Sequence, residues 1–262
     1  MKPPWGEGTF LVSDFSIFNF QFSIPPATPY PDPKMKLVLF DIDGTLLTDC
    51  GASREAFGDA LRVVYDYDDD LSRYDFSGRT DPQIAHMVLK DAGFPRRDIE
   101  AQMPRLWELY LAALARNATP DRVRVMPGMR ELVAALHEHD DVALALLTGN
   151  IERGARLKLG GASLNEYFPF GAFGSDSADR TELPPVAIRR ASTHLGMHFT
   201  GSDVVIIGDS IYDVRCGVPY GATTIAVASG KTPADVLRAE NPRFFFDDAS
   251  DFKAVMEAIL AP

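Results

Sequence analysis

Three short segments of this chain place acidic or hydroxyl side chains directly after an apolar run. They are Asp41-Ile42-Asp43-Gly44-Thr45, Thr148-Gly149-Asn150, and Gly208-Asp209-Ser210 with Asp213 about one helical turn later. If the apolar runs are strands of one parallel sheet, the segments lie at its carboxyl edge, where open sheets bind ligands. Carboxylates gathered there repel one another unless a cation neutralises them. The segments therefore predict a cation site.

The residue types also indicate the cation and the chemistry. Mg²⁺ prefers oxygen ligands and is typically held by one or two carboxylates, waters and a substrate phosphate. Thr148 and the neighbouring backbone N–H groups can hold a phosphoryl oxygen. A carboxylate beside the metal can attack phosphorus and form an aspartyl-phosphate. A second carboxyl two residues on can protonate the leaving oxygen and then activate water.

Each segment taken alone also has a purely structural interpretation. Asp43-Gly44 is a common turn dipeptide. Thr148 and Asp209 can cap helices, and Asp213 can be a surface acid. The occurrence of all three segments in one chain favours the catalytic interpretation.

The elements that would position these residues follow from the hydrophobic pattern. Short apolar runs predict strands buried on both faces of a parallel sheet, at 36–40, 142–147, 203–207, 223–227 and 243–246. Helical patterns occur at 128–137, 151–159, 184–195, 214–218, 233–239 and 251–260. Strands that alternate with helices indicate βαβ units, so the predicted fold class is α/β, with a doubly wound parallel sheet.

One stretch interrupts this alternation. Between 53 and 117 the pattern is helical, with helices predicted from the cap Ser53 to about 65, from Asp81-Pro82 as N-cap and first residue to 92, and over 98–116. We expect a helical subdomain over 51–119, inserted into a core made of 35–50 and 120–262.

Residues 1–34 differ in composition from the rest of the chain. They hold seven prolines, and polar residues interrupt their apolar stretch, which also lacks the cleavage site of a secretory signal. Met35 then opens an apolar run typical of the start of an α/β protein. We expect Met35 to be the true start and 1–34 to be a wrongly assigned or disordered extension, which N-terminal mass spectrometry of the native protein would test.

Charge and composition limit the classes of partner. The formal net charge of −11 argues against binding to nucleic acid or to anionic membranes. No apolar run reaches the roughly 18 residues of a membrane span. Cys50 and Cys216 show no disulfide or zinc spacing, which favours a reduced, cytoplasmic protein. We expect a monomer or homodimer that acts on a small-molecule phosphate ester.

The three segments, in this order, resemble motifs I, II and IV of the haloacid dehalogenase-like (HAD) superfamily. The matching stretches are Phe40–Leu46, Leu147–Asn150 and Gly208–Asp213. The resemblance covers about residue 35 to the end of the chain. It implies a Rossmann-like HAD core with a C1-type helical cap, similar to phosphoglycolate phosphatases, and Mg²⁺ as the cofactor.

The resemblance also implies roles for individual residues. Asp41 would be the nucleophile and a metal ligand, and Asp43 would be the general acid/base and give the metal its backbone carbonyl. The remaining implied roles are phosphoryl binding by Thr148, Gly149 and Asn150, and metal binding by Asp209 and Asp213, the latter directly or through water. The family's third motif supplies a Lys or Arg beside the nucleophile. The region 174–184 has no Lys, and we assign this role to Arg180.

The inserted helices resemble a cap that closes over the site. Within them, Ser77-Gly78-Arg79-Thr80-Asp81 resembles a loop that reaches the substrate. Arg79 and Thr80 are therefore candidate substrate contacts. Gly78-Arg79 equally fits a simple turn between two helices, and the sequence does not decide between these interpretations.

The resemblance leaves several functions to weigh. Dehalogenases lack the second acid of motif I, which is present here as Asp43, and the lone cap lysine Lys90 does not fit a phosphonatase. The preferred function is a Mg²⁺-dependent phosphatase that works through an aspartyl-phosphate. A sugar phosphomutase is the alternative, and a non-catalytic binding module is less favoured because no core acid is missing. The resemblance suggests phosphoglycolate, sugar phosphates or nucleotides as substrates without choosing among them.

Overall fold

A parallel sheet of six strands organises the part of the chain, residues 35–262, that the computed structural model describes. The strand order is β5-β4-β1-β6-β7-β8. The strands are β1 (Lys36–Phe40), β4 (Val142–Leu147), β5 (Gly171–Ala172), β6 (Val204–Gly208), β7 (Thr223–Val227) and β8 (Phe244–Phe246). The extension predicted for residues 1–34 lies outside the described residues.

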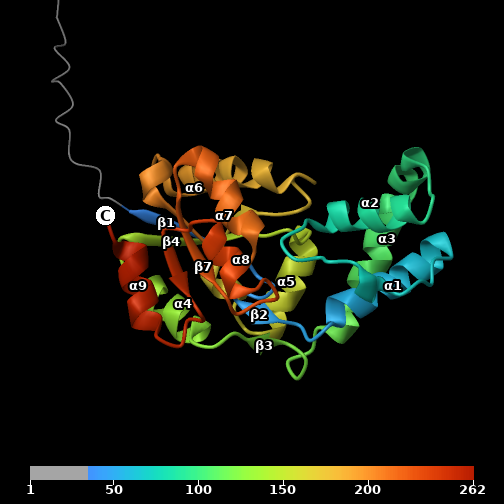
Figure 1. Cartoon of the computed structure of the whole chain (residues 1–262), viewed down its shortest axis with the longest axis horizontal. Helices are drawn as coiled ribbons and strands as arrows, with labels where there is room; N and C mark the ends of the chain where they lie inside the picture. The colour runs from blue at the N-terminus through green and yellow to red at the C-terminus, as the bar shows by residue number, and fades with distance from the viewer. Residues whose placement is uncertain (1–34) are drawn as a thin grey trace, which may run out of the picture. The chain divides into compact units, whose positions relative to one another are not determined.

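Side chains of β1 alternate between two hydrophobic cores, one on each face of the sheet. Val38 and Phe40 belong to one core, and Leu37 and Leu39 belong to the other. Figure 1 shows helices on both sides. On one side are α4 (Met129–His137), α5 (Glu152–Gly161) and α9 (Phe252–Leu260), and on the other are α6 (Leu183–Leu195) and α7 (Ile211–Gly217). The predicted doubly wound α/β fold is therefore confirmed.

The order of the strands reverses at β1, which pairs in parallel with β4 on one side and β6 on the other. In open α/β sheets such a reversal opens a crevice at the carboxyl ends of the strands. The chain leaves β1 at Asp41, whose backbone N–H donates to the carbonyl of Ile207 at 3.0 Å. Asp41 and Asp43 are therefore held at the position where the fold binds ligands.

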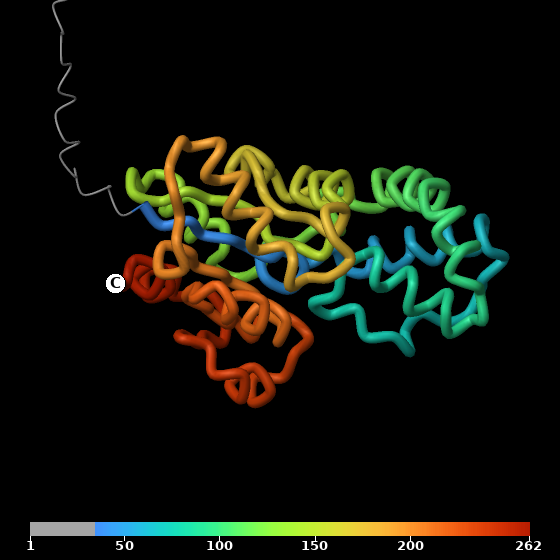
Figure 2. The backbone as a smooth tube through the Cα atoms, turned by 90° about the horizontal axis from the view of Figure 1, so that it is seen from above, coloured from blue at the N-terminus to red at the C-terminus, as the bar shows by residue number. Residues whose placement is uncertain are grey.

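Three helices with their own hydrophobic core lie between the short antiparallel strands β2 (Leu47–Thr48) and β3 (Arg124–Val125). They are α1 (Ala52–Tyr65), α2 (Asp81–Asp91) and α3 (Arg96–Asn117). They fall within the range 51–119 predicted for the insertion, and Figure 2 shows them together at one end of the described part of the chain. No helix in the described part of the chain is long and apolar enough to cross a membrane.

Two predicted helix caps are wrong. The N-cap of α2 is Thr80 rather than Asp81, because the Thr80 hydroxyl accepts from the Gln83 N–H and forms a capping box. The N-cap of α1 is Gly51, in a left-handed conformation, and Ser53 lies inside the helix. Strand β6 begins one residue later than predicted, because 201–203 form a 3₁₀ turn.

Candidate active site

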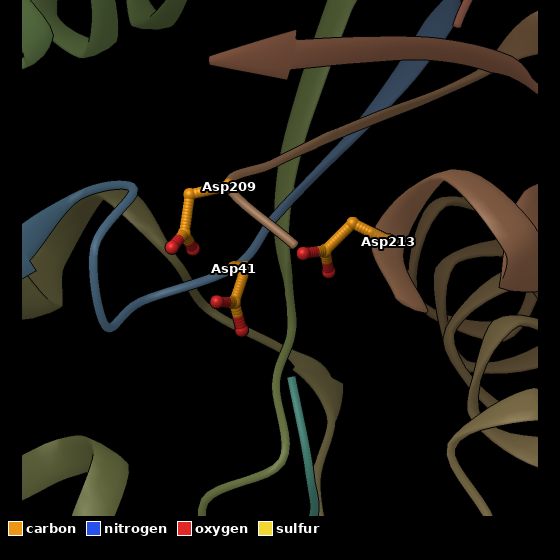
Figure 3. Close-up of side chains that lie close together, drawn as sticks. All are labelled: Asp41, Asp209 and Asp213. Atoms are coloured by element: carbon orange, nitrogen blue, oxygen red, sulfur yellow. The ribbon is translucent and has the colours of Figure 1, made fainter. Parts of the chain in front are cut away.

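Figure 3 shows the carboxylates of Asp41, Asp209 and Asp213 close together beyond the ends of β1 and β6. One oxygen from each can be chosen so that all three lie within 4.8 Å of one another. All three residues are buried. This is the juxtaposition that the acidic segments predicted, and it follows from the parallel pairing of β1 with β6.

Burial and mutual repulsion change the acidity of these groups. Burial raises the pKa of Asp41 to about 7; Arg180 opposes the shift, while Asp213 and Asp43 add to it. Burial, with the charges of Asp41 and Asp213, also raises the pKa of Asp209 well above its ordinary value. Carboxylates in such a setting are stabilised by a hard divalent cation, which takes oxygen ligands.

The backbone around Asp209 forms a close-fitting cradle for its carboxylate. A Cβ atom at Gly230 would lie 1.6 Å from Asp209 Oδ2, and one at Gly44 would lie 2.4 Å from the same oxygen. The hydroxyl of Thr45 donates to Asp209 Oδ1 at 3.1 Å. Asp41 and Asp209 both line the cavity described below. Their oxygen donors and this cradle fit a magnesium ion.

Asp213, unlike Asp41 and Asp209, does not line the cavity. Its Oδ2 accepts from the backbone N–H of Ser210 at 3.0 Å and from the Ser210 hydroxyl at 2.6 Å, which caps the start of α7. Its Oδ1 pairs with Arg180. Both carboxylate oxygens of Asp213 thus have partners within the chain. This arrangement suits the supporting role, through water, better than direct metal contact.

Arg180 begins the 3₁₀ turn Arg180–Glu182, and its side chain is 4% exposed. Its Nη2 donates to Asp41 Oδ1 at 3.0 Å and to the Leu147 carbonyl at 3.3 Å. Burial opposes the charge on this guanidinium, but the carboxylates of Asp213 and Asp41 outweigh burial and raise its pKa. A permanent cation therefore lies beside the predicted nucleophile, as the assignment of Arg180 required.

The loop after β4 presents Thr148, Gly149 and Asn150 to the same cavity. The Thr148 hydroxyl accepts from the Asn150 side-chain amide at 2.8 Å. The same amide donates to Asp43 Oδ2 at 2.7 Å. A Cβ at Gly149 would lie 2.1 Å from the Arg79 carbonyl, so only glycine fits beneath the loop of the inserted helices. Hydrogen bonds of the Asn150 amide thus link Thr148, a predicted phosphoryl-binding residue, to Asp43.

These residues line a cavity of about 390 Å³. The sheet end supplies Asp41, Asp43, Asp209 and the loop after β4. The insertion supplies Arg54 from α1, Ile84 from α2 and Phe76 from the loop before α2, among others. Lys231 contributes a cation on the core side. The volume suits a small molecule.

The two predicted contacts from the inserted helices differ in outcome. Arg79 lines the cavity, and its Nε donates to the Asp75 carbonyl at 3.2 Å. Gly78, with φ of 65°, also makes the turn that the alternative interpretation required. The prediction that Thr80 contacts the substrate is wrong. Thr80 is fully buried, caps α2, and its hydroxyl donates to the Ala178 carbonyl at 2.8 Å. The Thr80 hydroxyl links the insertion to the core, and Thr80 is not among the residues that line the cavity.

Sequence reasoning missed Lys158, which lies in α5 and contacts Asp43. The signal was its position on the helix. Lys158 shares the buried face of α5 with Gly154, Ala155 and Leu159, where a lysine is unexpected. Asp81, which the sequence suggested only as a helix cap, also lines the cavity. Desolvation raises its pKa to about 6, although Lys158 and the Ile151 N–H oppose that shift.

The doubly wound sheet, the helical insertion after its first strand and the acidic site at the sheet's switch point together define a class of hydrolytic enzymes. The family model for haloacid dehalogenase-like hydrolases matches residues 38–217. A second, related model matches residues 183–252. The chain belongs to the haloacid dehalogenase-like hydrolase family, and the predicted resemblance is confirmed.

The chain is similar to several phosphatases of this family. It is 25% identical over 223 residues to a phosphoglycolate phosphatase of Pseudomonas fluorescens (strain Pf0-1), covering 84% of this chain and 79% of the relative. It is 26% identical to the probable phosphatase IndB of Dickeya dadantii (strain 3937), covering 86% of this chain and 94% of the relative. The crystal structure of a predicted phosphatase from Clostridium acetobutylicum shares the fold, with a TM-score of 0.65, 21% identity and coverage of 85% and 99%.

Proposed function

We propose that this protein is a Mg²⁺-dependent phosphatase that hydrolyses a small-molecule phosphate monoester through an aspartyl-phosphate on Asp41. The observation that carries the proposal is that the carboxyl groups of Asp41 and Asp43 line the same cavity in different environments. Asp41 is buried against the guanidinium of Arg180, while the Asp43 side chain, two residues on, is 44% exposed towards the same space. This arrangement supports attack on phosphorus by Asp41 and proton exchange by Asp43.

The reaction follows from what each side chain can do. Asp41 attacks phosphorus, the P–O bond to the leaving group breaks, and Asp43 gives its proton to the leaving oxygen. Asp43, now a carboxylate, then takes a proton from the water that attacks the aspartyl-phosphate and releases inorganic phosphate. Arg180 and the loop after β4 hold the phosphoryl oxygens. A Mg²⁺ ion held by Asp41, Asp209 and the Asp43 carbonyl would neutralise charge on the phosphoryl group.

The division of labour between core and insertion is part of the proposal. Residues 35–50 and 120–262 form the catalytic core, and 51–119 form a cap that excludes water from the cavity. Contacts between the two support it: the Asp81 N–H donates to the Gly149 carbonyl at 2.7 Å, and Arg180 donates to the Gly78 carbonyl at 3.4 Å. We further propose a cytoplasmic monomer or homodimer.

A phosphatase screen over a panel of phosphorylated metabolites, with Mg²⁺ and with EDTA, tests the proposal. We expect phosphate release from at least one member, dependent on Mg²⁺ and abolished in Asp41→Asn. Asp140→Asn is the matched control, because Asp140 is exposed and lies just before β4, at the amino ends of the strands and away from the site. A phosphoenzyme trapped by acid quench in the wild type, and absent from Asp41→Asn, would support the covalent intermediate.

The alternatives give different results in the same assay. A sugar phosphomutase would convert a hexose phosphate to its isomer with little phosphate release, a readout that nuclear magnetic resonance of phosphorus resolves. A binding module would bind phosphate esters without turnover. Activity that persists in Asp41→Asn would contradict the covalent mechanism.

A further inference from the structure

Lys158 is a buried cation on the apolar face of α5. Its side chain is 4% exposed, and Lys158 lies on the same buried face of the helix as Gly154, Ala155 and Leu159. Burying an ammonium group is unfavourable unless charged or hydrogen-bonding partners replace the lost water. The presence of a lysine at this position therefore depends on its partners.

The nearest partner is Asp43. Lys158 Nζ lies 2.8 Å from Asp43 Oδ1 and 2.7 Å from Asp43 Oδ2, so the ammonium contacts both oxygens of the carboxyl group. The Asn150 amide donates to Oδ2 at 2.7 Å. Together these two donors approach the carboxyl group from the β4–α5 side and leave the rest of it open to the cavity.

A purely structural role for Lys158, neutralising Asp49, explains less. Lys158 Nζ is 3.8 Å from Asp49 Oδ2, beyond hydrogen-bond distance. Asp49 already accepts from the backbone N–H groups of Gly51 at 3.0 Å and Ser53 at 2.9 Å, where α1 begins. Within residues 35–262, Lys158 is the cation that pairs with Asp43, whereas Arg180 pairs with Asp41 and Asp213.

Asp43 needs such support because of where it lies. The side chain extends from a loop, is 44% exposed, and has two rotatable bonds, so without fixed donors its carboxyl group would sample several orientations. Proton transfer requires the carboxyl group within hydrogen-bond reach of the leaving oxygen, and small displacements reduce the rate strongly.

We propose that Lys158 is a positioning residue that holds the acid/base carboxyl of Asp43 in its working orientation. This inference rests on the proposed phosphatase function and adds a residue to its machinery. Asn150 and Lys158 both belong to the segment that follows β4. That one segment therefore places the phosphoryl-binding hydroxyl of Thr148 and the proton-transfer group together.

The test uses two substrates that differ in their need for an acid. Nitrophenolate leaves p-nitrophenyl phosphate as a stable anion without a proton, whereas the alkoxide of 2-phosphoglycolate, or of the fastest alkyl phosphate in the panel, needs one. Since kcat/KM reports the steps through release of the leaving group, the ratio of kcat/KM for aryl over alkyl phosphate measures the acid contribution. The proteins are wild type, Asp43→Asn, Lys158→Met, and the double variant.

We expect Asp43→Asn to raise this ratio by about a hundredfold and Lys158→Met to raise it by at least about tenfold, within the range of acid–base catalysis. The double variant should match Asp43→Asn, because Lys158 acts through Asp43. Lys158→Arg, which keeps the charge but moves the donors, should fold even if Lys158→Met does not, and should raise the ratio by several-fold. Lys90→Met, at an exposed cap position, is the control for lost charge and should leave the ratio unchanged.

The outcomes separate the inference from the function on which it rests. A ratio that rises in Asp43→Asn but stays at the wild-type value in Lys158→Arg and in folded Lys158→Met overturns the positioning role alone. A ratio that does not rise in Asp43→Asn, or a wild type without phosphatase activity, overturns the proposed mechanism and the inference with it. Equal losses on both substrates in the Lys158 variants would show a general structural role and also overturn the inference.

Discussion

Asp41 is a buried carboxyl group whose replacement should change how stability depends on pH. Burial raises its pKa from the ordinary 3.8 to about 7, in spite of Arg180. A carboxyl whose pKa is higher in the folded chain keeps its contribution to stability below the unfolded pKa and loses it as the pH rises through the folded pKa. The metal-free wild type should therefore lose stability between about pH 5 and about pH 8. Asp41→Asn has no charge to bury at this position and should lose less stability over the same range, since only the raised pKa of Asp209 remains.

The size of the effect follows from the same pKa. The rise is roughly three pKa units, and each unit corresponds to about 1.4 kcal/mol, so the full penalty is on the order of 4 kcal/mol. Part of this penalty is already present at about pH 5, where the unfolded carboxyl is ionised. The share that appears between about pH 5 and about pH 8 is therefore about 2–3 kcal/mol.

Urea unfolding in EDTA, followed by circular dichroism at both pH values, measures this share. The quantity of interest is the free energy of unfolding of Asp41→Asn minus that of the wild type, because titrating groups that do not interact with Asp41 cancel in the difference. Asp209 does not cancel, since the charge of Asp41 helps to raise its pKa, and its change adds to the difference in the same direction. The difference should increase by about 2–3 kcal/mol from the lower to the higher pH. Asp140→Asn should show no such increase. An equal difference at both pH values would refute the reasoning that burial dominates the acidity of Asp41.

Three further substitutions test other contacts. Arg180→Met should lower the free energy of unfolding by about 3–5 kcal/mol and abolish activity, since it leaves two buried carboxylates without their cation; a loss below about 1 kcal/mol in urea unfolding would contradict this. Thr80→Ala should cost about 1–2 kcal/mol by the same assay, because it removes the α2 cap and the bond to the core; unchanged stability would be the contrary result. Gly230→Ala should raise the Mg²⁺ concentration for half-maximal activity by about tenfold or more, since the new Cβ would collide with the Asp209 carboxylate; an unchanged Mg²⁺ requirement would show that the cradle is not needed.

The two-residue strand β5 was not predicted. The other five strands of the sheet were predictable because their signal is local. Each is a continuous apolar run, and burial on both faces of a parallel sheet requires such a run whatever its neighbours are. The predicted bounds of β1, β4 and β7 agree with the structure at both ends. Helix starts were less predictable: the cap of α2 depends on which side chain reaches the free N–H groups, and two adjacent residues, Thr80 and Asp81, both have suitable oxygens.

The buried salt bridges were not predictable from any local pattern. Arg180 and Asp41 are 139 residues apart, and Lys158 and Asp43 are 115 residues apart. A family pattern directed attention to Arg180. For Lys158, the sequence offered a lysine on an apolar helix face, but nothing in the sequence named its partner.

The sequence by itself determined the parallel α/β core and placed Asp41, Asp43 and Asp209 at strand ends, because hydrophobic runs define strands and parallel strands end at one edge. The tertiary structure alone decided that Lys158 pairs with Asp43, and it places the Arg180 guanidinium beside Asp41, where the family pattern had assigned it. The physical reason is that ion pairing depends on distances of a few ångströms between side chains brought together by packing.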